Sequence, residues 1–156
     1  RSELDFSGLV TEAVEDAELL AAPGGIGVRA EIAPALRVSG DAILLRRVLL
    51  NLIDNAVRYN QPGGSVGLML TREKEQAVLA ISNTGPGIPA GKPGELFQRF
   101  VRLDLDRNRA AGGSGLGLSL CREIVAAHGG RIFLQQSDAD RTTFTVRLPA
   151  LKASGA

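Results

Sequence analysis

A glycine-rich stretch that runs directly into an apolar helical pattern constrains the fold of this chain more than any other feature. From Gly112 to Gly130 the sequence reads GGSGLGLSLCREIVAAHGG. Leu116, Leu120 and Ile124 recur every four residues, which predicts a helix with one buried stripe. Backbone N–H groups at a glycine-opened helix start can approach an anion closely, so the stretch favours phosphate binding. The spacing of its glycines matches neither a Walker loop nor the GxGxxG pattern of dinucleotide-binding folds. The alternative to a phosphate-binding role is a tight turn that only leads into a core helix.

The composition indicates a single globular domain. The 156 residues carry a formal net charge of only +1, which argues against nucleic acid as a partner. One cysteine excludes an internal disulfide and, with a single histidine, argues against a zinc site. The chain contains neither an apolar run of roughly 18 residues nor a secretory signal, so we expect a cytoplasmic fragment. Residues 1–150 are expected to form the domain, with 151–156 as a flexible tail.

Two helices are predicted in the first sixty residues. Ser7 is the expected N-cap of a helix over residues 7–22, and Asp41 of a helix over residues 42–59. Short strands are expected at 28–32 and 36–39 between them. The buried stripe of the second helix is expected to contain Leu44, Val48, Leu52, Ile53 and Ala56.

The second predicted helix carries an unusual polar face. Asn51 and Asn55 lie one turn apart, and Arg58 and Tyr59 follow one turn later. Asparagine is unfavourable inside a helix because its side chain competes for backbone hydrogen bonds. Two such residues beside an apolar stripe predict polar groups directed into a cleft.

Two β-hairpins and a long loop complete the prediction. Residues 65–72 and 76–83 have strand composition around a polar turn, and so do 131–137 and 142–148. The loop from about Gly91 to Gly113 has no lasting periodicity, and loops of this length in a compact domain are usually functional. Its arginines predict a mobile lid over phosphates, with a disordered surface loop as the alternative. They are Arg99, Arg102, Arg107 and Arg109.

Four stretches in the same order resemble the motifs of one family. LLRRVLLNLIDNAVRYNQPGG is similar to an N box, SNTGPGIP to a first glycine box, ELFQRFVR to an F box and GGSGLGLSL to a second glycine box. The chain thus resembles the catalytic ATP-binding domain of sensor histidine kinases, in the gyrase, Hsp90 and MutL ATPase superfamily. The resemblance implies an α+β fold, a two-layer sandwich with a mixed sheet of about five strands packed on three helices (a Bergerat-type ATP-binding fold).

The same resemblance implies a site for ATP and Mg²⁺. Asn55 would be the Mg²⁺ ligand, Asn51 its partner at the phosphates and Arg58 a further phosphate contact, and these three are the implied catalytic groups. One amide oxygen suffices, because Mg²⁺ takes most of its ligands from phosphates and water. The implied nucleotide-binding residues are Tyr59, Asn83, Gly85, Gly87, Ile88, Arg107, Arg109, Gly113, Ser114, Gly115, Leu116 and Gly117.

Asn83 departs from the family pattern, which usually has Asp there to recognise the adenine amino group. An Asn carbonyl can still accept a hydrogen bond from that neutral N–H group. The alternative reading is a nucleotide-binding module with weak or no catalysis.

His128 and Cys121 are expected to be structural. His128 ends a predicted helix before two glycines, which favours a cap and dipole role over that of a phosphoacceptor. Cys121 lies among apolar neighbours and is expected to be a small core residue.

Position 51 separates the competing functions. Hydrolytic members of the superfamily carry Glu there as a general base, whereas Asn51 cannot accept a proton. A neutral histidine is already a competent nucleophile, so the favoured function is transfer of the γ-phosphoryl group of MgATP to a histidine. The expected partners are a separate histidine-bearing dimerisation domain and a response regulator. We expect a monomeric fragment, and a homodimeric full-length protein anchored in the inner membrane.

Overall fold

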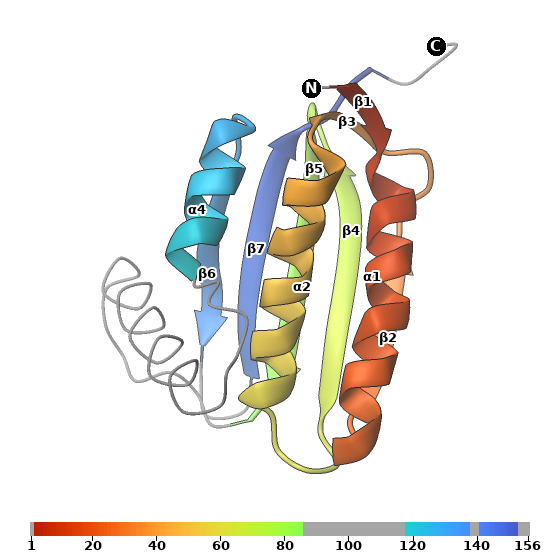
Figure 1. Cartoon of the computed structure of the whole chain (residues 1–156), viewed down its shortest axis with the longest axis vertical. Coiled ribbons are helices and arrows are strands. Elements are labelled where there is room, and N and C mark those ends of the chain that lie inside the picture. Colours follow the sequence, from red (N-terminus) through yellow and green to blue (C-terminus); the bar gives the residue numbers. More distant parts are fainter. Residues whose placement is uncertain (1, 86–117, 138–140, 153–156) are drawn as a thin grey trace.

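The computed structural model describes residues 2–85, 118–137 and 141–152, which form two layers. A five-stranded sheet of order β2-β4-β5-β7-β6 is covered on one face by the three α-helices of the described ranges (Figure 1). The helices are α1 (Phe6–Ala21), α2 (Ala42–Arg58) and α4 (Leu118–Ala127). The strands are β2 (Gly27–Ile32), β4 (Ser65–Glu73), β5 (Gln76–Thr84), β6 (Arg131–Ser137) and β7 (Arg141–Pro149). The predicted two-layer α+β sandwich and both predicted hairpins are confirmed.

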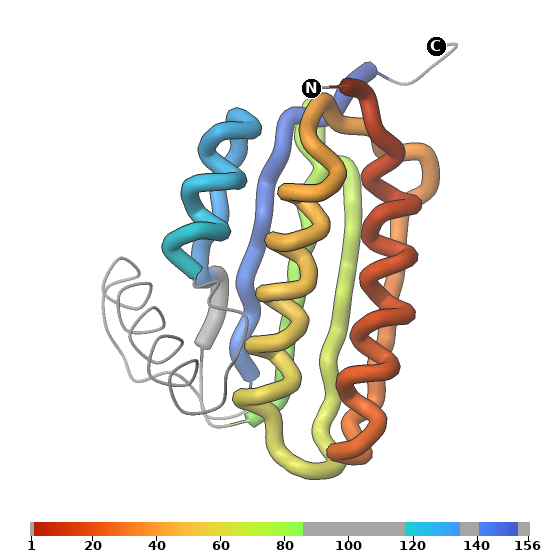
Figure 2. The backbone as a smooth tube through the Cα atoms, in the orientation of Figure 1, coloured from red at the N-terminus to blue at the C-terminus, as the bar shows by residue number. Residues whose placement is uncertain are grey.

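The path of the chain brings two distant segments to the same end of the molecule. In the orientation of Figure 2, α1, α2 and β5 run downward, while β2 and β4 run upward. β2 pairs parallel with β4, whereas the other neighbours in the sheet are antiparallel, which makes the sheet mixed. The C-terminal ends of α2 and β5 therefore lie together at the lower end.

A second, smaller sheet lies at the opposite end. β1 (Ser2–Asp5) pairs antiparallel with β3 (Arg37–Gly40), and Val38 forms a further bridge with Ala150. The sequence analysis did not predict β1. Leu151, which it assigned to the tail, donates its backbone N–H to the Arg37 carbonyl at 2.8 Å.

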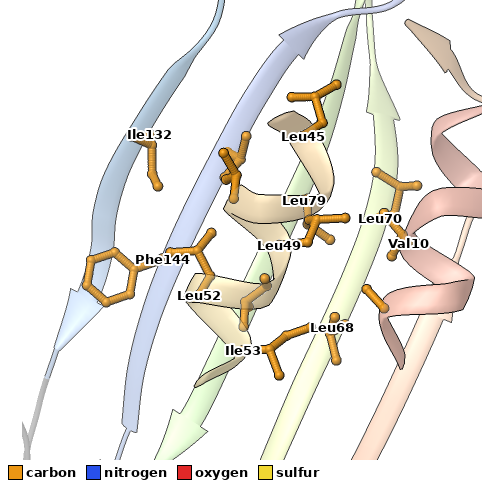
Figure 3. Close-up of a cluster of buried hydrophobic side chains, with 14 of the residues drawn as sticks. Val10, Leu45, Leu49, Leu52, Ile53, Leu68, Leu70, Leu79, Ile132 and Phe144 are labelled. Carbon is orange, nitrogen blue, oxygen red and sulfur yellow. The ribbon is translucent and has the colours of Figure 1, made fainter. Parts of the chain in front are cut away.

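The core lies between α2 and the centre of the sheet. Leu45, Leu49, Leu52 and Ile53 project from α2 toward Leu68, Leu70 and Leu79 of the two central strands (Figure 3). Each of these side chains is at most 2% exposed. Burial of one such side chain contributes about 1.5–3 kcal/mol, so this interface fixes the orientation of α2 about its own axis.

Each of two predicted helix stripes was wrong at one described position, while Val48, Leu52, Ile53, Ala56 and Ile124 are buried as predicted. Leu44 is 36% exposed, and Leu45 is buried in its place. In α4, Leu118, Cys121, Ile124 and Val125 are buried while Leu120 is only partly so. The core role predicted for Cys121 is confirmed. The error arises because several leucines in a row fit more than one helical stripe, and only the sheet selects among them.

The first helix is capped by Asp5, so the prediction that Ser7 caps it was wrong. The Asp5 carboxylate accepts a hydrogen bond from Gly8 N–H at 3.0 Å. Ser7 is turned inward instead, where its Oγ donates to the Ala33 carbonyl (2.6 Å) and accepts from Leu36 N–H (2.9 Å). The predicted cap of α2 is confirmed, because Asp41 accepts from the N–H groups two and three residues later.

Helix α1 continues into a 3₁₀ turn, η1 (Ala22–Gly24). No helix in the described ranges has the length and apolar character needed to cross a bilayer.

Ala35 gives a test of the turn between β2 and β3. Its φ of +61° lies in the left-handed region, which costs a non-glycine residue about 1–2 kcal/mol. Glycine adopts this conformation freely but loses more entropy on folding. We expect Ala35→Gly to raise the free energy of unfolding by about 1 kcal/mol in urea denaturation.

A control for this substitution is Ala22→Gly. Ala22 has a φ of −55°, where glycine relieves no strain, so this variant should be less stable than the original chain. Equal effects of the two substitutions would contradict the assignment of strain to Ala35.

Candidate functional site

Asn51 and Asn55 form a buried polar patch on α2. They are 9% and 6% exposed, and they lie next to the apolar stripe that packs on the sheet. Within the described part of the chain, neither side-chain amide has a hydrogen-bond partner. A buried polar group without a partner costs about 1–3 kcal/mol, so such groups in a native fold call for an explanation. A bound ligand that pairs with both amides supplies one.

Asn83 is a third buried amide, near the end of β5 on the same face of the sheet as the core residues. It is 6% exposed and pairs in register with Val66 and Thr142. Its Nδ2 donates to the backbone carbonyl of Thr84 at 2.9 Å. This bond assigns the orientation of the amide and leaves Oδ1 without a partner among the described residues. Asn83 therefore offers a hydrogen-bond acceptor, as an Asp at this position would.

Gly85 marks the place where the end of β5 touches the end of α2. Its φ is +134°, and a Cβ there would overlap the carbonyl oxygen of Tyr59. Any larger residue would push the two segments apart. Tyr59 itself is the C-cap of α2 and is half-buried against the core. The structure thus brings together Tyr59 and Gly85, two of the predicted nucleotide-binding residues.

Arg58 is paired within its own helix. Its Nε lies 2.9 Å from Asp54 Oδ2, one turn earlier on α2, and both side chains are 37% exposed. The sequence analysis did not weigh this i,i+4 pair, although the spacing alone indicates it. An exposed pair of this kind contributes only about 0.3–0.5 kcal/mol, so Arg58 can exchange partners at little cost.

The other predicted site residues lie outside the described residues, and so does the predicted lid from about Gly91 to Gly113. Their roles stay predictions. They are Gly87, Ile88, Arg107, Arg109, Gly113, Ser114, Gly115, Leu116 and Gly117.

His128 has a structural role, as expected from its place at a helix end. It is 6% exposed, and its Nδ1–H donates to the carbonyl of Ile124 in the last turn of α4 at 2.7 Å. Its Nε2 accepts from the backbone N–H of Asp41, the N-cap of α2, at 3.0 Å. Both ring nitrogens are occupied in a neutral tautomer, so neither is available as a nucleophile. The link to α2 was not predicted, since residues 41 and 128 share no local pattern.

The fold and its buried polar face define a nucleotide-binding domain of the Bergerat type. The chain belongs to the family described as "Histidine kinase-, DNA gyrase B-, and HSP90-like ATPase", whose model matches residues 40–152. The matched region includes α2 and β5, which are the described elements that carry the candidate site.

Curated relatives narrow the comparison to sensor kinases. The chain is 39% identical over 150 residues to the sensor protein CutS of Streptomyces coelicolor, covering 96% of this chain and 36% of CutS. It is 36% identical over 150 residues to the sensor-like histidine kinase SenX3 of Mycobacterium tuberculosis, with 96% and 37% covered. The chain spans about a third of the length of these relatives.

Solved structures match the fold of the described residues. The mycobacterial sensor histidine kinase MprB matches with a TM-score of 0.76 and 29% identity, covering 96% of this chain and 97% of that one. The nucleotide-free catalytic domain of histidine kinase ThkA matches with a TM-score of 0.78 and 26% identity, covering 95% and 94%. The fold is that of a histidine kinase catalytic domain.

The link between α4 and α2 can be tested by replacing His128. His128→Ala leaves the Asp41 N–H and the Ile124 carbonyl without their partner and opens a cavity, so we expect a loss of about 3 kcal/mol in the free energy of unfolding. Denaturant titration followed by circular dichroism measures this loss. Glu123→Ala, at an exposed position of the same helix, is the control and should change stability by less than about 0.5 kcal/mol.

Proposed function

We propose that this chain is the catalytic domain of a two-component sensor histidine kinase, and that it transfers the γ-phosphoryl group of MgATP to a histidine on another domain. The observation that carries the proposal is the pair of buried amides of Asn51 and Asn55, which have no hydrogen-bond partner among the residues that the structure describes. They leave a place for polar ligand atoms on α2 while offering no proton acceptor to activate water.

Asn55 fits a Mg²⁺ ion bound together with the nucleotide. Its buried amide oxygen is a hard donor, and Mg²⁺ combines few protein oxygens with phosphate oxygens and water. The ion, when bound, neutralises charge on the transferred phosphoryl group. Asn51 would hold the phosphates from the preceding turn, and Arg58 would leave Asp54 to contact them.

Asn83 would recognise the base. Because its Nδ2 is held by the Thr84 carbonyl, Oδ1 is the atom that faces a ligand, and it accepts from an exocyclic amine such as that of adenine. Guanine presents a carbonyl oxygen at the equivalent position. That oxygen and Asn83 Oδ1 would then both lack a hydrogen-bond donor. The Oδ1 acceptor therefore supports ATP binding by this chain. It argues against the alternative in which Asn83 weakens or abolishes the catalytic function of the module. Gly85 and Gly87 would line the adenine pocket, and Gly113, Gly115 and Gly117 would let the end of the lid wrap the phosphates. The further nucleotide contacts would be Ile88, Arg107, Arg109, Ser114 and Leu116.

The amide at position 51 favours a histidine acceptor over water. Asn51 occupies the position of the general base in hydrolytic relatives, and nearby Asp54 is exposed and paired with Arg58. A neutral imidazole attacks phosphorus without losing a proton first, so it needs no base on this domain. His128 does not serve, because both of its nitrogens are engaged.

The partners follow from this chemistry. The acceptor histidine would belong to a dimerisation domain of the same full-length kinase, and a response regulator would receive the phosphoryl group from it. Residues 1–150 would form the catalytic domain, monomeric by itself, and 151–156 a tail. We place the domain in the cytoplasm, where ATP is available, and expect the full-length protein to be a homodimer anchored in the inner membrane.

Asn55→Ala tests the metal and phosphate site. We expect the Kd for MgATP to rise at least tenfold, while the free energy of unfolding without nucleotide stays equal or increases, because a buried unpartnered amide is removed. Calorimetric titration with and without Mg²⁺ measures binding. Arg47→Ala, at an exposed position of the same helix, is the control. A loss of stability with an unchanged Kd would show that Asn55 is structural and would sink the assignment.

The acceptor is tested with γ-labelled ATP. We expect the isolated domain to bind ATP without becoming labelled, because transfer needs a nucleophile about 3–3.5 Å from the phosphorus. Addition of a dimerisation domain that carries its histidine should produce label on that domain. Stable label on His128 of the isolated domain would overturn the proposal.

A further inference from the structure

A closed hydrogen-bond network joins the end of α2 to the ends of two strands. We call it the Asn60–Thr84 network; it consists of these two side chains and the backbone of Ser65. Thr84 Oγ1 donates to Asn60 Oδ1 at 2.7 Å and accepts from Ser65 N–H at 2.8 Å. Asn60 Nδ2 donates to the carbonyls of Ala56 (3.2 Å) and Ser65 (2.9 Å).

Every polar atom of the two side chains is used. Asn60 Oδ1 also accepts from Gln61 N–H at 2.8 Å, so both its lone pairs and both amide hydrogens are engaged. The Thr84 hydroxyl donates once and accepts once. A network in which every side-chain hydrogen is engaged is rigid, and it leaves no side-chain donor of these two residues for a ligand.

Gly64 shows how closely the network is packed. A Cβ at this position would overlap both Asn60 Oδ1 and Thr84 Oγ1. The loop between α2 and β4, which carries both Asn60 and Gly64, is therefore packed closely against the end of β5.

Each side chain of the network is next in sequence to residues of the candidate site. Asn60 follows Tyr59, the C-cap of α2, and lies two positions after Arg58 and five after Asn55. Thr84 lies between Asn83 and Gly85, and its own carbonyl holds the Asn83 amide. The network thus ties the element that would bind phosphate and metal to the element that would bind the base.

We propose that Asn60 and Thr84 are positioning residues for the nucleotide, which fix the distance between the base-binding end of β5 and the phosphate-binding face of α2. The proposal rests on the proposed function. A nucleotide that contacts both elements at once gains affinity only while their separation matches its length. Loss of the Thr84 hydroxyl frees the two elements, so it weakens ATP binding although Thr84 touches no ligand.

Thr84→Val and Thr84→Ser test the proposal as a pair. Valine keeps the shape and removes the hydroxyl, whereas serine keeps the hydroxyl. We expect Thr84→Val to raise the Kd for MgATP at least fivefold at a temperature where the domain is folded, and Thr84→Ser to stay within twofold of the original chain. Calorimetric titration gives the Kd, and urea denaturation of the same samples gives the stability.

Ser7→Ala separates positioning from a general loss of stability. Ser7 also joins two backbone groups through one hydroxyl, but at the opposite end of the fold, near the start of α1. Ser7→Ala should lose a similar amount of stability and keep its Kd within twofold. An unchanged Kd in Thr84→Val, or an equal rise in Ser7→Ala, would overturn the proposal.

Asn60→Asp supplies an independent variant. It keeps the acceptor for the Thr84 hydroxyl but loses the Nδ2 donor to Ala56 and Ser65, so its Kd should also rise. The loss of binding free energy in the Asn60→Asp/Thr84→Val double variant should be smaller than the sum of the two single losses, since both substitutions break one network. Fully additive losses would contradict a shared role. If the original chain fails to bind MgATP the proposed function fails, whereas binding that is unaffected by either substitution refutes the network alone.

Discussion

The packing of α2 against the sheet positions the polar groups of the candidate site. The same helix carries the largest part of the core, through Leu45, Leu49, Leu52 and Ile53, and the unpartnered amides of Asn51 and Asn55 beside it. Rotation of α2 about its axis would expose the leucines before it could bring the amides to water. Since each leucine contributes about 1.5–3 kcal/mol of burial, the core holds the amides in place.

The cost of those amides is also an energetic link to the ligand. A folded domain that buries unpartnered polar groups is less stable than one that pairs them, by about 1–3 kcal/mol for each group. A ligand that binds only the folded form removes this cost and stabilises the fold by mass action. In the site that we propose, core packing and ligand binding are therefore coupled through one helix, and ligand binding would offset the stability that these residues cost.

The sequence predicted most of the fold because its signals are local. The cap at Asp41, the hairpin around residues 73–75 and the shared face of Asn51 and Asn55 each follow from spacing within one segment. The errors at Ser7 and Leu44 arose where two nearby residues could serve, and contacts with other elements selected the neighbour. The contacts between Asn60 and Thr84 and between His128 and Asp41 could not be predicted. They join groups that lie 24 and 87 positions apart in the sequence. No local sequence pattern at either residue predicts its partner.

The hydrogen bond from the Asp41 N–H to the His128 ring also makes the exchange of that amide proton sensitive to the contact between α4 and α2. The proton that a helix cap usually leaves to water is instead covered by the side chain of His128, the residue that follows α4. That proton can exchange with solvent only when α4 separates from the start of α2, whether or not the rest of α2 unfolds. Its hydrogen-exchange rate, measured on the backbone amide resonance of Asp41, thus reports how often the end of α4 separates from the start of α2.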